Sequence, residues 1–195
     1  MDADEEINRE KDCVFSRDHS EAERIAAGER VIQNHVANKR WGPLHAMAFW
    51  RSVPMEIPEH AGIATVNGYA SEGNYPRVYE MTWEEGLPEK VKKTAKELLG
   101  DAIEIAIAKY VREGKKRDLY EIELDRCLPF ANRLHAHEEL EKLGGYNFLR
   151  DTIAPMVAEL GDELRKISRR KSQKPRGFEF AEPPKERKVP KRLLN

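Results

Sequence analysis

Apolar residues recur every three or four positions in four long stretches of the chain, which is the spacing of one face of an α-helix. The stretches are residues 20–38, 88–113, 136–143 and 147–170. Ser20 and Glu23 have the spacing of a capping box at the start of the first stretch. Gly114 follows the second stretch as a stop signal. The pattern therefore predicts a mostly helical fold.

The last of these stretches carries a regular apolar stripe. Its members are Leu149, Ile153, Met156, Val157, Leu160, Leu164 and Ile167. Pro155 lies inside the stretch and has no amide hydrogen to donate, so it predicts a kink or a restart of the helix. We expect the stripe to be buried in the core of the domain.

One stretch has the two-residue period of a β-strand. Within it, Ala64, Val66 and Gly68 alternate with Ile63, Thr65, Asn67 and Tyr69. Residues 71–76 contain Gly, Asn and Pro, which favour a turn, and residues 78–83 are again β-branched and aromatic. We therefore expect a β-hairpin over 62–83 and a fold that is mostly α with a small β-hairpin (α+β). No internal repeat is visible.

Charge and composition divide the chain into three regions. We expect an acidic arm over 1–18, a compact helical α+β body over 19–168, and a basic, proline-rich extended tail over 169–195. Residues 165–195 contain twelve Lys or Arg and three Glu, a net of +9. The preceding 164 residues contain 22 basic and 32 acidic residues, a net of −10. Charged ends of this kind are disordered unless a partner orders them.

The basic tail gives the strongest functional signal. Lys and Arg neutralise phosphates and release their counterions, and aromatic side chains between them can stack on bases or fill a pocket. We predict that the tail contacts RNA or an acidic protein surface, and we favour RNA. The predicted contact residues are Arg169, Arg170, Lys171, Lys174, Arg176, Phe178, Phe180, Lys185, Arg187, Lys188, Lys191 and Arg192.

Residue types that carry catalysis are not grouped in any recognisable motif. The sequence contains no Gly-x-Ser-x-Gly and no glycine-rich phosphate loop. His135 and His137, followed by Glu138, Glu139 and Glu141, form one metal-like cluster. A stable metal site needs three or four ligands, so we interpret this cluster as a charged helix start. We expect no metal, no cofactor and no enzymatic activity.

One alternative rests on a resemblance. The order of residues from Trp41-Gly42-Pro43-Leu44-His45-Ala46 to Tyr79 resembles that of the flavin-dependent thymidylate synthases, and Leu128-Pro129 and Phe148-Leu149-Arg150 resemble later blocks of that family. The resemblance implies a nucleotide enzyme that binds FAD. Its site residues would be Asn67, Ser71, Arg77 and Tyr79. Glu59 and Ala61 stand where the family has two flavin-binding arginines, whose guanidinium groups they cannot replace.

The cellular setting follows from what the composition excludes. Two cysteines cannot form a disulfide framework, the first residues are acidic, and no run of about 20 apolar residues could span a bilayer. We expect an intracellular protein in a reducing compartment, either the cytoplasm or an organelle matrix. The leading hypothesis is a non-catalytic structural subunit of a larger assembly, such as a ribonucleoprotein or an organellar complex, with protein subunits as its partners.

Overall fold

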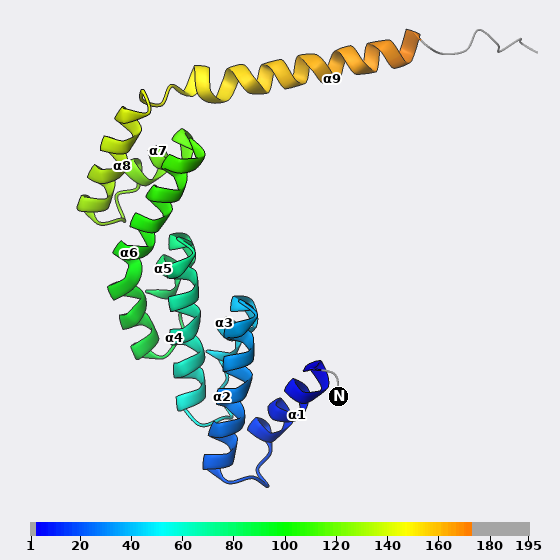
Figure 1. Cartoon of the computed structure of the whole chain (residues 1–195), viewed down its shortest axis with the longest axis vertical. Helices are drawn as coiled ribbons and strands as arrows, with labels where there is room; N and C mark the ends of the chain where they lie inside the picture. Colours follow the sequence, from blue (N-terminus) through cyan, green and yellow to red (C-terminus); the bar gives the residue numbers. More distant parts are fainter. Residues whose placement is uncertain (1–2, 173–195) are drawn as a thin grey trace, which may run out of the picture. The chain divides into compact units, whose positions relative to one another are not determined.

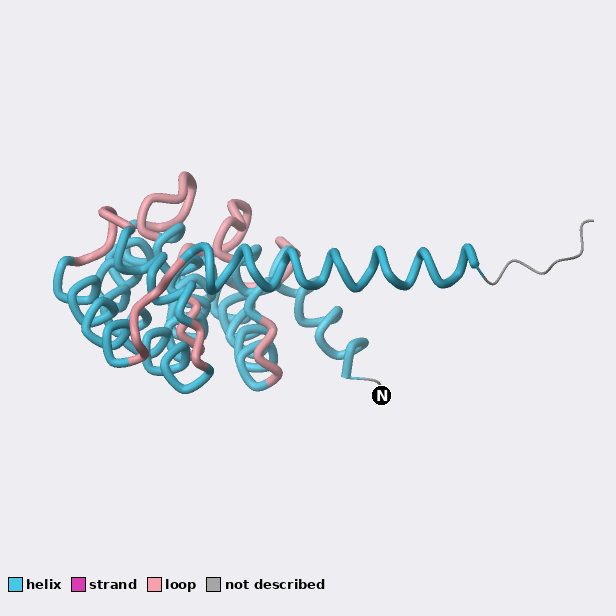
Figure 2. The backbone as a smooth tube through the Cα atoms, turned by 90° about the horizontal axis from the view of Figure 1, so that it is seen from above, coloured by secondary structure: helices cyan, strands magenta, loops and turns pink. Residues whose placement is uncertain are grey.

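A computed structural model describes residues 3–172, and throughout this range the regular structure is helical (Figure 1). No strand occurs between residues 3 and 172, as the tube in Figure 2 makes plain. The elements are α1 (Ala3–Phe15), α2 (Glu21–Ala37), α3 (Trp41–Met47), α4 (Glu56–Ser71), α5 (Tyr75–Met81), α6 (Glu89–Glu113), α7 (Lys116–Leu124), α8 (Phe130–Lys142), the π-helical turn η1 (Leu149–Ile153) and α9 (Ala154–Ser172).

The β-hairpin predicted over 62–83 is wrong, because α4 and α5 occupy this stretch. The buried residues of α4 surround most of its circumference and include Ile57, Ala61, Gly62, Thr65, Val66 and Gly68. A helix enclosed on several sides loses the polar face that would reveal a 3.6-residue period. Its alternation of small and large residues therefore imitated a strand, and the fold is all-helical over the described range rather than α+β.

Contacts divide the chain into two units, Met1–Tyr146 and Asn147–Asn195. In the first unit the helices pack as four consecutive pairs, α1–α2, α3–α4, α5–α6 and α7–α8. The second helices of these pairs also contact one another in chain order, α2 with α4, α4 with α6, and α6 with α8 (Figure 1). Packing in which each pair contacts its neighbours along the chain is the architecture of an α-solenoid.

The buried positions of these pairs repeat along the sequence, although no repeat was visible in the sequence alone. Two apolar positions recur in the first helices, at Leu44, Val78 and Leu119 and again at Met47, Met81 and Ile122. In the second helices one fully buried alanine recurs, as Ala27, Ala61, Ala95 and Ala136. The spacings are 34 residues, and 41 between the third and fourth pairs.

The longer last spacing has a simple physical origin. The greater length of α6, which has 25 residues where α4 has 16, more than accounts for the seven extra residues. Seven added residues are close to two turns of an α-helix, so the same face of α6 continues to point towards its neighbours. The repeat is not apparent in the sequence because equivalent helices of successive pairs share at most four buried positions.

Glycines allow the second helices to approach closely at two crossings. A Cβ at Gly28 of α2 would lie 2.7 Å from Ile57 of α4, and one at Gly62 of α4 would lie 2.5 Å from Val91 of α6. Gly28 and Gly62 are 34 residues apart, as are Ile57 and Val91. Two successive pairs therefore use the same contact. Contacts of glutamate carboxylates bridge the same layer, each between residues 31 apart, namely Glu29–His60, Glu59–Lys90 at 2.6 Å and Glu104–His135 at 2.6 Å.

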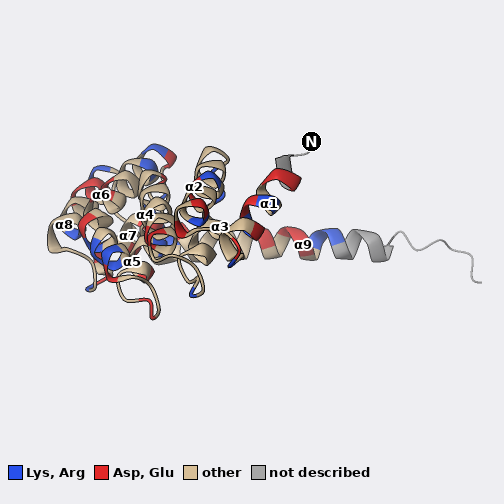
Figure 3. Cartoon of the chain, turned by 90° about the horizontal axis from the view of Figure 1, so that it is seen from below, with Lys and Arg blue, Asp and Glu red and all other residues tan. Residues whose placement is uncertain are grey.

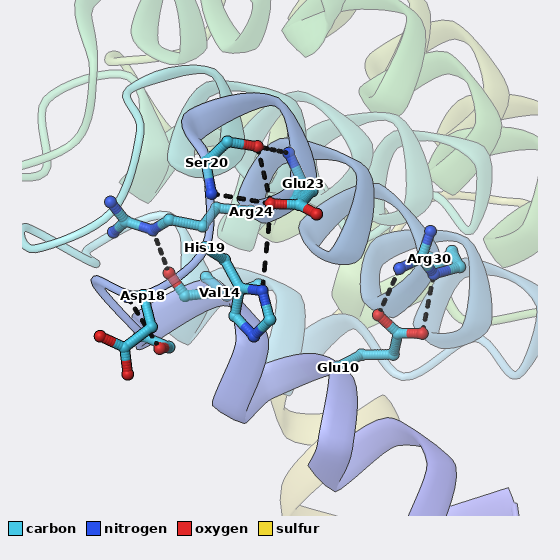
Figure 4. A network of polar contacts seen from close by, with 9 residues as sticks. Glu10, Val14, Asp18, His19, Ser20, Glu23, Arg24 and Arg30 are labelled. Carbon is cyan, nitrogen blue, oxygen red and sulfur yellow. Dashed lines mark hydrogen bonds and ion pairs between the residues drawn. The ribbon is translucent and has the colours of Figure 1, made fainter.

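The first residues, expected to be an arm, form helix α1, which packs on α2. Ile7 and Val14 are buried, and Arg24 of α2 donates a hydrogen bond from Nε to the carbonyl oxygen of Val14 at 2.8 Å (Figure 4). The capping box predicted at the start of α2 is confirmed, since the Glu23 amide donates to Ser20 Oγ and the Ser20 amide donates to Glu23 Oε2.

We expect Gly62→Ala to lower the free energy of unfolding by about 1–3 kcal/mol, because its methyl group would overlap the buried Val91 side chain. Urea denaturation followed by circular dichroism measures the change. Gly42→Ala is the matched control, because a Cβ at this helical glycine has nothing within 4 Å. Equal stability of the two variants would show that close approach at Gly62 is not needed.

Candidate interaction surface

The clearest candidate surface is an apolar stripe on α9. Met156, Val157, Leu160 and Leu164 are 60%, 62%, 61% and 58% exposed, and we call these four residues the α9 stripe. Within the described part of the second unit no element covers these four side chains, so the burial predicted for them does not occur inside this part of the unit. Periodicity predicts which side of a helix is apolar, but it carries no information on what packs against that side.

The chain enters α9 through the π-helical turn η1, so the restart predicted at Pro155 is confirmed. Pro155 lies in the first turn of α9. Ile153, at the end of η1, lines a shallow hollow together with Met156, Val157 and Leu160. The apolar surface thus continues across the junction between η1 and α9.

The spacing within this surface is that of a coiled-coil seam. Ile153, Val157, Leu160 and Leu164 are separated by four, three and four residues, and Ile167 follows three residues later in the sequence. These are the alternating a and d positions of a heptad repeat, with Val157 and Leu164 at a. All five of these positions are apolar.

Charges on α9 are segregated along its axis. Its first ten residues, 154–163, contain Glu159, Asp162 and Glu163 and no basic residue, whereas residues 164–172 contain five Lys or Arg and no acidic residue. Figure 3 shows the acidic half giving way to Lys and Arg. At the boundary Lys166 Nζ lies 2.7 Å from Glu163 Oε1. The helix has an apolar side, an acidic half and a basic half.

The predicted tail contacts begin on this helix. Arg169, Arg170 and Lys171 lie in the last turns of α9, where the structure describes the backbone but not these side chains. The other predicted contact residues lie outside the described residues, namely Lys174, Arg176, Phe178, Phe180, Lys185, Arg187, Lys188, Lys191 and Arg192. Their role stays a prediction.

The four residues implied by the synthase resemblance lie on two consecutive helices, Asn67 and Ser71 on α4 and Arg77 and Tyr79 on α5. The first three use their polar groups locally, through Asn67 Nδ2 to the Ile63 carbonyl at 2.9 Å, Ser71 Oγ to the Gly68 carbonyl at 2.8 Å, and Arg77 to Glu80 at 2.7 Å. A hydrogen bond with Cys127 raises the pKa of Tyr79. FAD binding and nucleotide chemistry stay predictions of that resemblance.

The metal-like cluster is split between two neighbouring helices. His135 Nδ1 lies 2.6 Å from Glu104 Oε2 of α6, whereas His137 Nδ1 lies 3.1 Å from Glu123 Oε1 of α7. Among the described residues no group of three or more His, Cys, Asp or Glu is placed to hold a metal ion. In this arrangement both histidines tie α8 to the helices beside it.

A histidine that the sequence reading missed is buried in α2. His35 is 3% exposed, and neither ring nitrogen has a hydrogen-bond partner. Burial lowers its pKa from the ordinary value of 6.5, and the positive charges of Lys11 and Arg40 lower it further. His35 follows Val31 by four residues and so lies on the apolar face of α2. This spacing in the sequence already indicated that His35 would be buried.

Comparisons with models of protein families, with curated proteins and with solved structures find no match for this chain. Among residues 3–172, none of the helices combines the length and the apolar character needed to cross a bilayer.

Protonation of His35 should destabilise the fold. Because folding lowers its pKa, the unfolded chain binds more protons as pH falls through about 6.5, so this stabilising contribution is present at neutral pH and lost in acid. We expect the free energy of unfolding to fall less steeply between about pH 7 and 5 in His35→Leu than in the wild type. Urea denaturation at each pH measures this, and identical slopes would contradict the assignment.

Proposed function

We propose that this chain is a non-catalytic structural subunit of a larger assembly, to which it attaches through its carboxyl-terminal helix and basic tail. The observation that carries the proposal is the α9 stripe, a set of large apolar side chains about 60% exposed that leads directly into a basic sequence. A soluble protein gains free energy by covering such a surface, and contiguous exposed apolar patches mark interaction sites.

Burial of the α9 stripe would contribute substantially to the free energy of binding. Burying one Val, Leu or Met side chain contributes roughly 1.5–3 kcal/mol, so even partial cover of the α9 stripe yields several kcal/mol before the entropic cost of association. This is a substantial part of the about 8 kcal/mol that a micromolar complex requires, and contacts outside the stripe must supply the remainder.

The last helical pair of the solenoid supports a second protein contact. Leu134 of α8 is the repeat equivalent of Glu59 of α4, which bonds Lys90 of the following pair at 2.6 Å. Leu134 is exposed, as is Phe130 one turn earlier. Solenoids cover their ends with polar faces. An apolar end is therefore suited to stacking against a protein neighbour.

The charge distribution supports an acidic partner for the tail. Residues 165–195 carry a net charge of +9 and include Phe178 and Phe180 between two basic clusters. Phosphate groups are the densest source of negative charge in a cell, and exposed bases offer stacking surfaces to aromatic side chains. RNA can bind both the positive charge and the aromatic side chains of the tail, whereas an acidic protein is complementary to the positive charge alone.

The test replaces with Gln, in the full-length chain, the seven Lys and Arg residues among the predicted tail contacts that follow Ser172, which leaves the charges of α9 unchanged. We expect co-purification of the partner to fall by at least about tenfold, because each lost cation removes one phosphate contact and its counterion release. Nuclease treatment of the wild-type complex should release the partner. Sensitivity to salt without sensitivity to nuclease would identify an acidic protein instead.

The matched control neutralises exposed cations of the body, Lys93, Lys96, Lys109 and Arg112 on α6, and should retain the partner. Retention of every partner by the tail variant would overturn the proposed function. Circular dichroism of both variants verifies that the helical body is intact.

A further inference from the structure

We propose that the α9 stripe is covered by α9 of a second copy of this chain, in an antiparallel pair. This inference rests on the proposed function only for the premise that α9 is a contact surface, and it goes beyond it by naming the partner. The described part of the second unit contains η1 and α9, and its side chains leave the stripe exposed. Three features of α9 favour its own copy as the occupant.

The first feature is the phase of the stripe. A seam of apolar residues at alternating a and d positions is typical of helices that pair along their length, and Met156 at the flanking g position widens this seam on one side. Val157, Leu160 and Leu164 alternate at these positions, and Ile153 lines the same face. Knobs from such a seam fit the holes of an identical seam.

The second feature is the division of charge. In a parallel pair the acidic half, with Glu159, Asp162 and Glu163, would lie beside the acidic half of its partner. In an antiparallel pair each acidic half lies beside the basic half that begins at Arg165 and Lys166. Opposite charges attract and opposed helix dipoles add to this preference. The helix is complementary to a reversed copy of itself.

The third feature is a line of small residues that flanks the seam. Ala154, Gly161 and Ser168 are spaced by seven residues and occupy one heptad position next to the d position. A Cβ at Gly161 would have only the end of the Arg165 side chain within 4 Å. Small side chains at a flanking position let two helix backbones approach closely. The same seven-residue period thus governs both the apolar seam and its margin.

Together these features describe an isologous, two-fold interface, in which residue i of one chain meets residue j of the other and the reverse. Pairing uses the apolar side of α9 and leaves its outer side in solvent. The basic tail, which is the site of the proposed acidic partner, is not needed for pairing. The two contacts can therefore be separated by experiment.

Sedimentation equilibrium of the full-length chain tests the pairing. We expect a concentration-dependent dimer, and we expect Leu160→Glu to weaken it by at least about a hundredfold, because an unpaired carboxylate would be buried twice in the interface. Ala158→Glu is the matched control, since Ala158 is exposed at a heptad position away from the seam and should leave dimerisation unchanged. Circular dichroism should show an intact body in both variants.

Orientation is measured with spin labels in a background that lacks the free cysteines Cys13 and Cys127. Single cysteines replace Ala158, Arg165 and Ser172 in turn, three sites at one heptad position away from the seam, and pulsed electron resonance gives the distance between the two copies of each label. In an antiparallel pair this distance grows with the separation of the site from the two-fold axis, with 1.5 Å of rise per residue, so the three distances cannot all be equal. Three equal distances would indicate a parallel pair and overturn the proposal.

A wild-type chain that stays monomeric at about 100 µM, where even a weak pair with a micromolar Kd would form, also overturns the inference. That result would leave the tail experiment, and with it the proposed function, unaffected. Conversely, a dimer lost in Leu160→Glu but present in the tail variant would support the inference whatever the tail binds. A dimer that persists in Leu160→Glu would place the interface elsewhere and overturn the inference.

Discussion

Close approach between the second helices of successive pairs is the constraint on which the folded unit depends. It is made possible by residues without bulk at the crossings, with Gly28 against Ile57 and Gly62 against Val91. A buried alanine column beside these contacts keeps the helices near enough for their apolar faces to interlock. The carboxylate contacts of Glu29, Glu59 and Glu104 add directional links across the same layer. Two of the three crossings between successive second helices use this glycine contact.

The same constraint explains where surfaces are left open. In a stack of this kind each pair of helices is covered by the pairs on either side of it. The last pair therefore has one side that no further pair covers. Here that side carries Phe130 and Leu134, which are exposed. The second unit then brings a separate apolar surface, the α9 stripe, whose residues no element within that unit covers. The described residues therefore combine a body built by repetition with two sets of exposed apolar side chains.

Much of the local structure could be predicted from the sequence. The capping box at Ser20, the stop of α6 at Gly114 and the restart at Pro155 are all encoded by a few neighbouring residues, and all three are confirmed. The β-hairpin failed because α4 is buried around more than half of its circumference, which leaves only a narrow polar side. The repeat was not predicted because successive pairs share their packing contacts more than their residue types.

The candidate surface was predictable only in part. The spacing of the α9 stripe identified its apolar residues, but their exposure depends on the absence of a neighbour, which no local pattern encodes. His35 could have been noticed on the apolar face of α2, whereas its lack of a hydrogen-bond partner needed the packed structure. The basic tail beyond Ser172 lies outside the described residues, so its contacts rest on charge and composition alone.

The central claim is that the apolar side of α9 is a surface for another molecule. Amide hydrogen exchange of the full-length chain, measured over a range of protein concentrations, tests this claim directly. The account predicts that protection of residues 154–172 rises with concentration while that of α4 and α6 stays constant. Protection of α9 that is complete and unchanged at the lowest concentration would contradict it, because the cover would then come from within the same chain.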